Sequence, residues 1–398
     1  MRRPSALTRR LAAGIAALLA VGLAAAPAAQ AAPEPGTGVP VTVMTRNLYL
    51  GGDIQRPLHA VLSLPPGTPA PVQLLAFAHA NHELRGIVDQ TDFPARSKLL
   101  AREIAANEPA LVGLQEVAIW RHGPLELGDI GHADAEVVDY DFLQTLLGDL
   151  AALGTPYVAV SVQQESDVEG PAFAGLPGSA EFAATAQDVR LTMRDVIIRP
   201  VGGKVKVRDH GSAQYDTRIT FPLGGASFSF IRGYNWADVT VGAKSFRFVN
   251  THLESQYSNV ALAQAMELLG GPAGPQDQPV IVVCDCNSDP LNHTIKPPPD
   301  SVPHSAPYDF ITGPGGFTDE WLQFAPAEEG FTSGLSELVD DPDTSKIDHR
   351  IDMVFARAAG GGPMPADQGR ITGLDPAART PSGLWASDHA GVVLRLRP

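Results

Sequence analysis

Polar side chains follow apolar, strand-like segments at five places in this sequence. In open sheets, the side chains at strand ends meet at one edge and form active sites. Carboxylate and amide oxygens suit Mg²⁺, and histidine exchanges protons near neutral pH. Taken singly, each residue has a structural explanation, such as a turn-forming asparagine or a histidine capped within a loop. The candidate site residues are Asn47, Glu116, His252, Asp285, Asn287, Asp352, Asp388 and His389.

The only two cysteines of the chain, Cys284 and Cys286, lie on either side of Asp285 in "VVCDCNSDP". Because alternate strand residues point to one face, Asp285 and Asn287 are expected to face the site while the cysteines face the packed side. Two such cysteines lie about 7 Å apart at Cα, near the upper limit for a disulfide, and their Cβ vectors are parallel. A zinc site would need two further ligands, and no other cysteine supplies them. The pattern therefore favours buried free thiols over a strained disulfide.

Strand-like segments alternate with helical ones in the first half of the chain and become denser in its middle. Besides the opening segment at 41–50, strands are predicted at 110–115, 157–162, 189–199, 228–232, 236–241, 245–251, 280–285, 351–355 and 391–396. Helices are predicted at 72–88, 94–106, 141–153 and 260–269. Two segments rich in Gly, Pro or Glu, 163–187 and 296–316, are predicted to be long surface loops. This order predicts a layered α/β or α+β fold in which sheets pack together with helices outside.

The N-terminus has the features of an export signal. A basic start, "MRRPSALTRR", precedes an apolar alanine-rich run and an "AQA" sequence at Ala29 to Ala31. We therefore predict a signal peptide at 1–31, a linker at 32–40, and a single domain at 41–398. The run is too short and weak for a membrane anchor, so we expect a secreted protein cleaved after Ala31, by either the general or the twin-arginine route.

Composition narrows the classes of function. The net charge is −15, which argues against a wide basic surface that grips polyanions, although a nuclease with a few well-placed arginines remains compatible. Hydrophobic residues make up 44% of the chain and charged residues 18%, enough to bury a large core. No stable protein partner is evident, and we expect a monomer.

Six short motifs, in order, resemble those of the endonuclease/exonuclease/phosphatase superfamily, which includes deoxyribonuclease I, exonuclease III, bacterial sphingomyelinases and inositol polyphosphate 5-phosphatases. The resemblance extends from Val41 to Leu396 and implies a four-layer α/β/β/α sandwich, in which two packed mixed sheets are flanked by helices. The motifs are Asn47, Gln115-Glu116, Asn250-Thr251-His252-Leu253, Cys284-Asp285-Cys286-Asn287, Arg350-Ile351-Asp352 and Ser387-Asp388-His389.

The resemblance also implies roles. Glu116 would hold Mg²⁺, with Mn²⁺ or Ca²⁺ as alternatives, helped by Asn47 and Asp388. Asp352 would orient His389, and either His389 or Asp285 would take the proton of the attacking water. Asn287 would donate to the phosphate. His252 would serve as acid or hydrogen-bond donor to the leaving group, a position at which exonuclease III lacks histidine. Arg194, in "MRDVIIR", looks like a phosphate-contacting arginine of deoxyribonuclease I, and a structural ion pair is the equal alternative.

The sequence departs from the family pattern at Cys284, where a glycine is usual, and it lacks the signatures of the 5-phosphatases. The leading hypothesis is a metal-dependent phosphodiesterase that acts on extracellular nucleic acid or a phospholipid headgroup by direct attack of water. The opening strand looks most like that of the bacterial sphingomyelinases. The alternatives are a phosphomonoesterase on a small molecule, whose loops at 163–187 and 296–316 would close over the ligand, and a non-catalytic binding module.

Overall fold

A computed structural model describes residues 39–128, 130, 132–223 and 226–398. The predicted signal peptide at 1–31 and most of the predicted linker at 32–40 lie outside the described residues. Among the helices of the described part, none combines the length and the apolar character needed to cross a bilayer.

The first sheet joins the two ends of the domain. Its order is β15-β16-β1-β2-β6-β3-β4, with β5 paired to β6. β1 runs parallel to β2 and antiparallel to β16, which places Asn47 beside Gln115. The strands are β1 (Val41–Asn47), β2 (Leu111–Gln115), β3 (Ile119–Gly123), β4 (Val137–Asp141), β5 (Tyr157–Ala172), β6 (Gln187–Pro200), β15 (Ala366–Thr372) and β16 (Gly391–Leu396).

The second sheet sets three candidate residues in one row. Its order is β13-β14-β12-β11-β10-β7. In its register His252 pairs with Asp285, and Asp285 pairs with Asp352. The strands are β7 (Val205–Gln214), β10 (Gly233–Val241), β11 (Lys244–His252), β12 (Val280–Asp285), β13 (Thr318–Asp319) and β14 (Asp352–Arg357).

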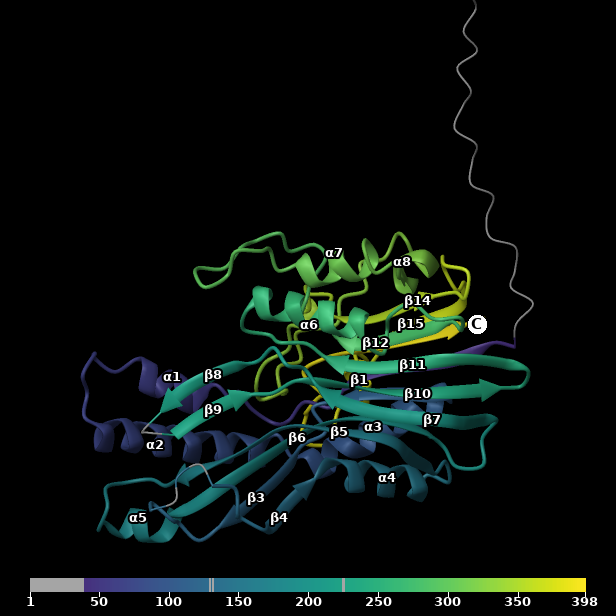
Figure 1. Cartoon of the computed structure of the whole chain (residues 1–398). Coiled ribbons are helices and arrows are strands. Elements are labelled where there is room, and N and C mark those ends of the chain that lie inside the picture. The colour runs from purple at the N-terminus through teal and green to yellow at the C-terminus, as the bar shows by residue number, and fades with distance from the viewer. Residues whose placement is uncertain (1–38, 129, 131, 224–225) are drawn as a thin grey trace, which may run out of the picture. The chain divides into compact units, whose positions relative to one another are not determined.

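The two sheets pack face to face between helices, so the four-layer α+β prediction is confirmed (Figure 1). An apolar core lies between them, with Val43 and Ile197 from the first sheet against Phe248 and Val283 from the second. The sheets approach closely at Gly113, where a Cβ atom would lie 2.4 Å from Val283. The outer face of the first sheet is covered by α2 (Ala70–Gln90), α3 (Phe93–Asn107) and α4 (Phe142–Ala152), and that of the second by α6 (Ser258–Gly270) and α7 (Ala306–Thr312).

The predicted loop at 163–187 is wrong over much of its length. Residues through Ala172 continue β5, and α5 (Ala180–Thr185) follows. Gly, Pro and Glu are poor strand formers, but β5 pairs with β6 over its whole length and breaks register twice, at Ala159/Ser161 and Gln164/Asp167. The tertiary pairing therefore overrides the local composition. The predicted loop at 296–316 likewise contains α7.

A separate two-stranded hairpin completes the fold. It consists of β8 (Ile219–Leu223) and β9 (Ala226–Phe230), and it lies beside α1 (Arg56–Leu62) and α2 (Figure 1). The ring centroids of Phe77 on α2 and Phe228 on β9 are 6.0 Å apart. The remaining elements are α8 (Glu320–Phe324) and two 3₁₀ turns, Thr344–Lys346 and Pro376–Ala378.

Candidate active site

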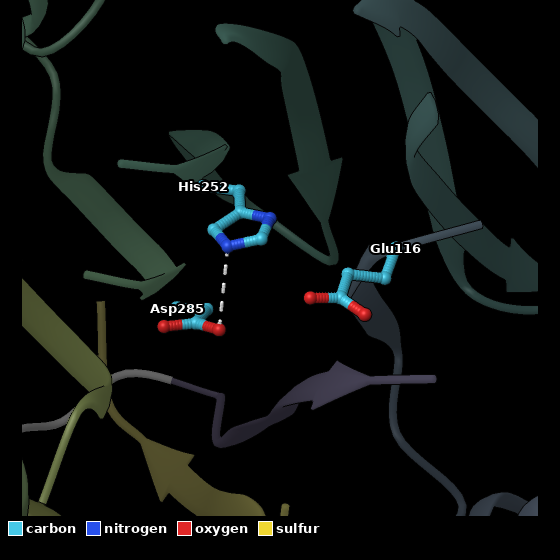
Figure 2. Close-up of side chains that lie close together, drawn as sticks. All are labelled: Glu116, His252 and Asp285. Atoms are coloured by element: carbon cyan, nitrogen blue, oxygen red, sulfur yellow. Dashed lines mark ion pairs between the residues drawn. The ribbon is translucent and has the colours of Figure 1, made fainter. Parts of the chain in front are cut away.

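The candidate residues converge on one edge of the two sheets, where β1, β2, β11 and β12 end and β14 and β16 begin. Asp285 lies at the centre. Its Oδ2 accepts a hydrogen bond from Asn47 Nδ2 at 2.9 Å, and it lies 3.5 Å from His252 Nε2 and 3.8 Å from His389 Nδ1. Figure 2 shows His252, Asp285 and Glu116 facing a common space. Asn47 and Asp285, which are 238 positions apart in the sequence, thus meet in one buried cluster.

His389 and Asp352 form a hydrogen-bonded pair. His389 Nδ1 lies 2.9 Å from Asp352 Oδ2, and both side chains are buried. Burial alone would lower the pKa of His389, but the carboxylates of Asp352, Asp388 and Asp285 outweigh it and hold the pKa well above its usual range. The short contact with Asp352 and the negative charges of the three carboxylates therefore favour an imidazolium whose Nδ1–H donates to Asp352.

His252 has the opposite environment. Its Nδ1 lies 2.9 Å from Arg232 NH1. Because a guanidinium only donates, His252 Nδ1 must accept this hydrogen bond, and the ring proton of the neutral imidazole lies on Nε2. Burial and the charge of Arg232 hold the pKa of His252 well below its usual range. Thus His252 presents a neutral Nε2–H to the space beside Asp285.

The network behind His252 was not found from the sequence. Arg232 NH1 also lies 3.4 Å from Glu165 Oε2, and Asp195 lies close enough to form a group with Glu165 and His252. Burial raises the pKa of Glu165 to about 7, against the opposing charge of Arg232. Arg232 lies in the short link between β9 and β10, and no sequence motif surrounds it. Its position next to the start of a strand is the one sequence signal for a functional role.

Carboxylates gather in the cleft that opens from the cluster, which has a volume of about 450 Å³. Arg232 is the only cationic side chain among the described residues that line it. Glu116 has a φ of 56°, an uncommon conformation for a residue with a side chain, and its Oε2 accepts the N–H of Leu50 at 2.8 Å. The lining carboxylates are Asp53, Glu116, Glu254, Glu337 and Asp388.

This donor set fits a divalent cation. Glu254 Oε2 is buried without a hydrogen-bond partner among the described residues, although its Oε1 accepts two backbone N–H groups. Burial raises the pKa of Asp388 to about 6, and the charge of Glu116 adds to the effect. Hard oxygen donors that repel one another are stabilised by a cation such as Mg²⁺. Glu254, which follows the Asn-Thr-His-Leu motif, is a ligand candidate that the sequence did not suggest.

The two amides of the predicted site are already hydrogen-bonded. Asn47 Oδ1 accepts the N–H of Tyr49 at 2.7 Å while its Nδ2 donates to Asp285, so its clearest structural role is to orient Asp285. Asn287 lies beyond the end of β12 with a φ of 44°, and its Nδ2 donates to the carbonyl of Leu253 at 3.0 Å. Asn287 therefore leaves the strand alternation on which its predicted orientation depended.

Arg194 forms the structural ion pair rather than facing the cluster. Its NH2 lies 2.7 Å from Asp141, and its Nε donates to the carbonyl of Val117. These contacts tie β6 to the segment that follows Glu116. Of the two interpretations of Arg194, the structure shows the ion pair.

The expectation of free cysteines is wrong. Cys284 and Cys286 form a disulfide, with their Cα atoms 5.1 Å apart. β12 ends at Asp285, and the N–H of Cys286 donates to the carbonyl of Ile351, so the chain leaves the extended conformation that would separate the two Cα atoms by about 7 Å. The side chains of both cysteines are fully buried on the packed side of the sheet, which is the side predicted for them.

Two buried arginines hold the backbone of the site. Arg96 on α3 donates to the carbonyls of Leu48, Tyr49 and Ala386, which ties the segment after β1 to the segment before Asp388. Arg46 pairs with Glu103 and donates to the carbonyl of His389. Buried guanidiniums with several carbonyl acceptors fix loops firmly.

No family model matches the sequence, and no curated protein matches it. Solved structures do match. An endonuclease/exonuclease/phosphatase family protein from Bacteroides thetaiotaomicron is 14% identical, with 90% of this chain and 98% of that chain covered and a TM-score of 0.50. A mannosyl-6-phosphatase from Bacteroides thetaiotaomicron VPI-5482 is 14% identical over 89% of this chain and 99% of that chain, with a TM-score of 0.48. A humanized TDP2 from D. rerio is 15% identical over 90% and 99%, with a TM-score of 0.48.

The first of these similarities establishes the fold. The chain has the fold of the endonuclease/exonuclease/phosphatase superfamily, and the assignment made from six ordered motifs is confirmed at that level.

Proposed function

We propose that this chain hydrolyses phosphodiesters with the help of a divalent cation, by direct attack of water. The observation that carries the proposal is the arrangement of two oppositely polarised histidines on either side of the buried carboxylate of Asp285. Such a centre provides groups for water, for the non-bridging oxygens and for the leaving oxygen of one phosphate.

The cation would be held by Glu116 and Asp388, with Glu254 and Asn47 as further oxygen donors. When bound, it supplies Lewis-acid stabilisation of the negative charge on the phosphate. The cleft supports this assignment, since an anionic substrate would otherwise meet a lining rich in carboxylates. We propose Mg²⁺ as the ion, with Mn²⁺ or Ca²⁺ as substitutes.

Asp285 is placed to orient the attacking water and accept its proton. Asn47 fixes Oδ2 of this carboxylate, and the N–H of Asn287 lies 3.1 Å from Oδ1. His389 is held through Nδ1 by Asp352, which leaves Nε2 to donate to the phosphate. Of the two candidates for general base, this geometry favours Asp285.

His252 is placed to donate its Nε2–H to the leaving oxygen. It would act as a neutral hydrogen-bond donor, because Arg232 occupies Nδ1. A neutral imidazole can stabilise developing oxyanion charge without transferring its proton in the ground state. Asn287 retains one amide hydrogen for the phosphate while the other binds the carbonyl of Leu253.

The substrate is proposed to be an extracellular phosphodiester, because the N-terminal sequence has the features of an export signal. Nucleic acid and phospholipid headgroups are the two sources. The proximity of Asn47, His252, Asp285, Asp352 and His389 in one buried cluster disfavours a non-catalytic module. A closed phosphomonoesterase pocket has less support, because much of the segment at 163–187 is strand β5 rather than a mobile loop.

The decisive experiment is a substrate panel with Mg²⁺, Mn²⁺, Ca²⁺ or EDTA. The substrates are bis-p-nitrophenyl phosphate, plasmid DNA, RNA, sphingomyelin and phosphatidylcholine. We expect hydrolysis of at least one phosphodiester, loss of it in EDTA, and a decrease of about 10³-fold or more in His389→Ala. His122→Ala is the matched control, because His122 pairs with Asp139 at 2.8 Å in the same manner on β3, and we expect it to retain activity.

A wild-type protein that hydrolyses no member of the panel with any of the three ions would contradict the proposed function. Activity that persists in EDTA would reject the requirement for a divalent cation but would leave the proposed phosphodiester hydrolysis in place.

A further inference from the structure

An apolar cavity of about 90 Å³ adjoins the acidic cleft. Its lining residues lie mainly on α1, α2, the hairpin β8–β9, and strands β5 and β6. Ile54 and Phe230 line both the cleft and this cavity, so the two spaces meet at these side chains. The walls include Leu58, Leu84, Val168, Leu191 and Met193.

A second apolar cavity continues from the first. Its volume is about 240 Å³, and it is lined by Leu74, Pro71 and Ile130. Phe77 and Phe228 line both apolar cavities. The three spaces therefore follow one another from Glu116 in the cleft, past Ile54 and Phe230, to the far side of Phe77. We call the two apolar cavities together the apolar track.

The polar groups along the track already have partners within the protein. Asn81 Nδ2 donates to the carbonyls of Gly170 and Pro171, each at 3.1 Å. Glu169 Oε2 accepts the N–H of Ala135, and Ser166 is hydrogen-bonded to the backbone at Ile231. An occupant of the track would meet few free donors or acceptors, so its own surface must be apolar.

The dimensions select a chain rather than a ring system. An apolar cavity of about 150 Å³ suits benzene, whereas the first cavity is smaller than that. A single alkyl chain is thinner than an aromatic ring, and Ile54 and Phe230 are the side chains that it would contact between the cleft and the first cavity. A nucleobase would leave its polar edges unpaired in such a site. The net charge of −15 also disfavours a polyanionic substrate.

We propose that the apolar track binds one hydrocarbon chain of an amphiphilic phosphodiester whose phosphate lies in the cleft. This inference rests on the proposed function, and it selects a lipid phosphodiester over nucleic acid as the substrate class. The end of the chain next to the phosphate passes Ile54 and Phe230, and its far end reaches Leu74. Burial of each methylene group stabilises the complex by a transfer free energy that grows with chain length.

The test is a series of p-nitrophenyl alkyl phosphates with methyl, butyl, octyl and dodecyl chains, assayed below their micelle concentrations. We expect kcat/KM to increase by up to about fourfold per methylene, and by on the order of 10²-fold from methyl to octyl. In Leu58→Trp the indole fills the first cavity, so this dependence should disappear while the methyl ester is hydrolysed as in the wild type. Leu62→Trp is the matched control, because Leu62 lies on the same helix and is 64% exposed.

A binding measurement separates the two proposals. Calorimetry with dodecyl phosphate and methyl phosphate should show at least 10²-fold tighter binding of the long chain to the wild type, and loss of that difference in Leu58→Trp. Equal rates for methyl and octyl esters, or faster cleavage of DNA or RNA than of the octyl ester, would overturn the lipid inference and leave the phosphodiesterase in place. Chain-dependent binding without hydrolysis of any ester would support the track and reject the proposed function.

Discussion

The two sides of Asp285 carry the same residue type in opposite electrical settings. On one side, His389 faces the carboxylate of Asp352 through Nδ1. On the other, His252 faces the guanidinium of Arg232 through Nδ1. The carboxylates around His389 hold its pKa well above the usual range against the effect of burial, whereas burial and Arg232 hold the pKa of His252 well below it.

This difference shows that the protonation state of a buried histidine depends on the group that contacts its Nδ1. A carboxylate behind the ring stabilises the imidazolium, and a cation behind it stabilises the neutral ring with its proton on the far nitrogen. One buried carboxylate can thus have a charged donor on one side and a neutral donor on the other. Variants that lack the partner or the ring on either side of Asp285 test this difference.

The largest effect is expected on the carboxylate side. Asp352→Asn replaces the carboxylate that faces His389 Nδ1 with a neutral amide whose NH2 can donate to this nitrogen, so the ring should lose its charge and adopt the wrong tautomer. We expect kcat to decrease by about 10³- to 10⁴-fold with little change in the melting temperature. Asp139→Asn makes the same change behind His122 and should leave kcat unaltered. Equal activities for the two variants would remove His389 and Asp352 from the mechanism.

The next effect separates the chemistry of the two rings. His252→Ala removes one hydrogen-bond donor and should lower kcat by about 10²- to 10³-fold. His252→Gln keeps a neutral N–H donor and should restore about tenfold of that loss. His389→Gln should be as inactive as His389→Ala, because an amide cannot carry the charge. Rescue by glutamine at both positions, or at neither, would contradict the difference in charge assigned to the two rings.

A smaller effect is expected from removal of the guanidinium of Arg232. Arg232→Met removes the donor to His252 Nδ1 and the nearby positive charge, so the pKa of His252 should rise toward its usual value. Imidazole NMR should show His252 titrating as the pH falls from 8 to 5 in the variant and remaining neutral in the wild type, and kcat/KM should decrease by roughly tenfold. Arg232→Lys keeps a cation and a donor, and its ring should stay neutral. A wild-type ring that is protonated at neutral pH would contradict the assigned tautomer.

The smallest catalytic effect is expected at Arg194, which lies outside both sides of the cluster. Arg194→Ala breaks the contact with Asp141 and the hydrogen bond to Val117, so we expect a loss of about 1 to 2 kcal/mol in the free energy of unfolding. The value of kcat/KM should change by less than about threefold. A loss above about 30-fold without a change in stability would restore the phosphate-contacting role.

Much of the fold follows from local patterns. The predicted helices at 72–88, 94–106 and 141–153 correspond to α2, α3 and α4, because their apolar spacing and their start signals agree. Asp92 and Asp141, for example, each accept backbone N–H groups at a helix start. The segment at 163–187 could not be predicted in this way, since β5 depends on pairing with β6 rather than on its own composition.

The expectation of free thiols requires the strand to continue through Asn287, whereas β12 ends at Asp285. Its actual end at Asp285 depends on the hydrogen bond from Cys286 to Ile351, 65 residues later in the numbering of the chain. The same turn changes the direction of Asn287. A single misjudged strand end therefore accounts for both corrections.

By itself, the sequence determined which polar residues end the strands and in what order they occur, because hydrophobic periodicity and short motifs are local properties. Only the tertiary structure decided which neighbour each histidine meets, and whether an apolar track adjoins the cleft. Arg232 and His252 are 20 positions apart, Asp352 and His389 are 37 apart, and Phe77 meets Phe228 across two separate elements. The charge of a buried group depends on the atoms within a few ångströms of it, and the packing of the two sheets brings those atoms together.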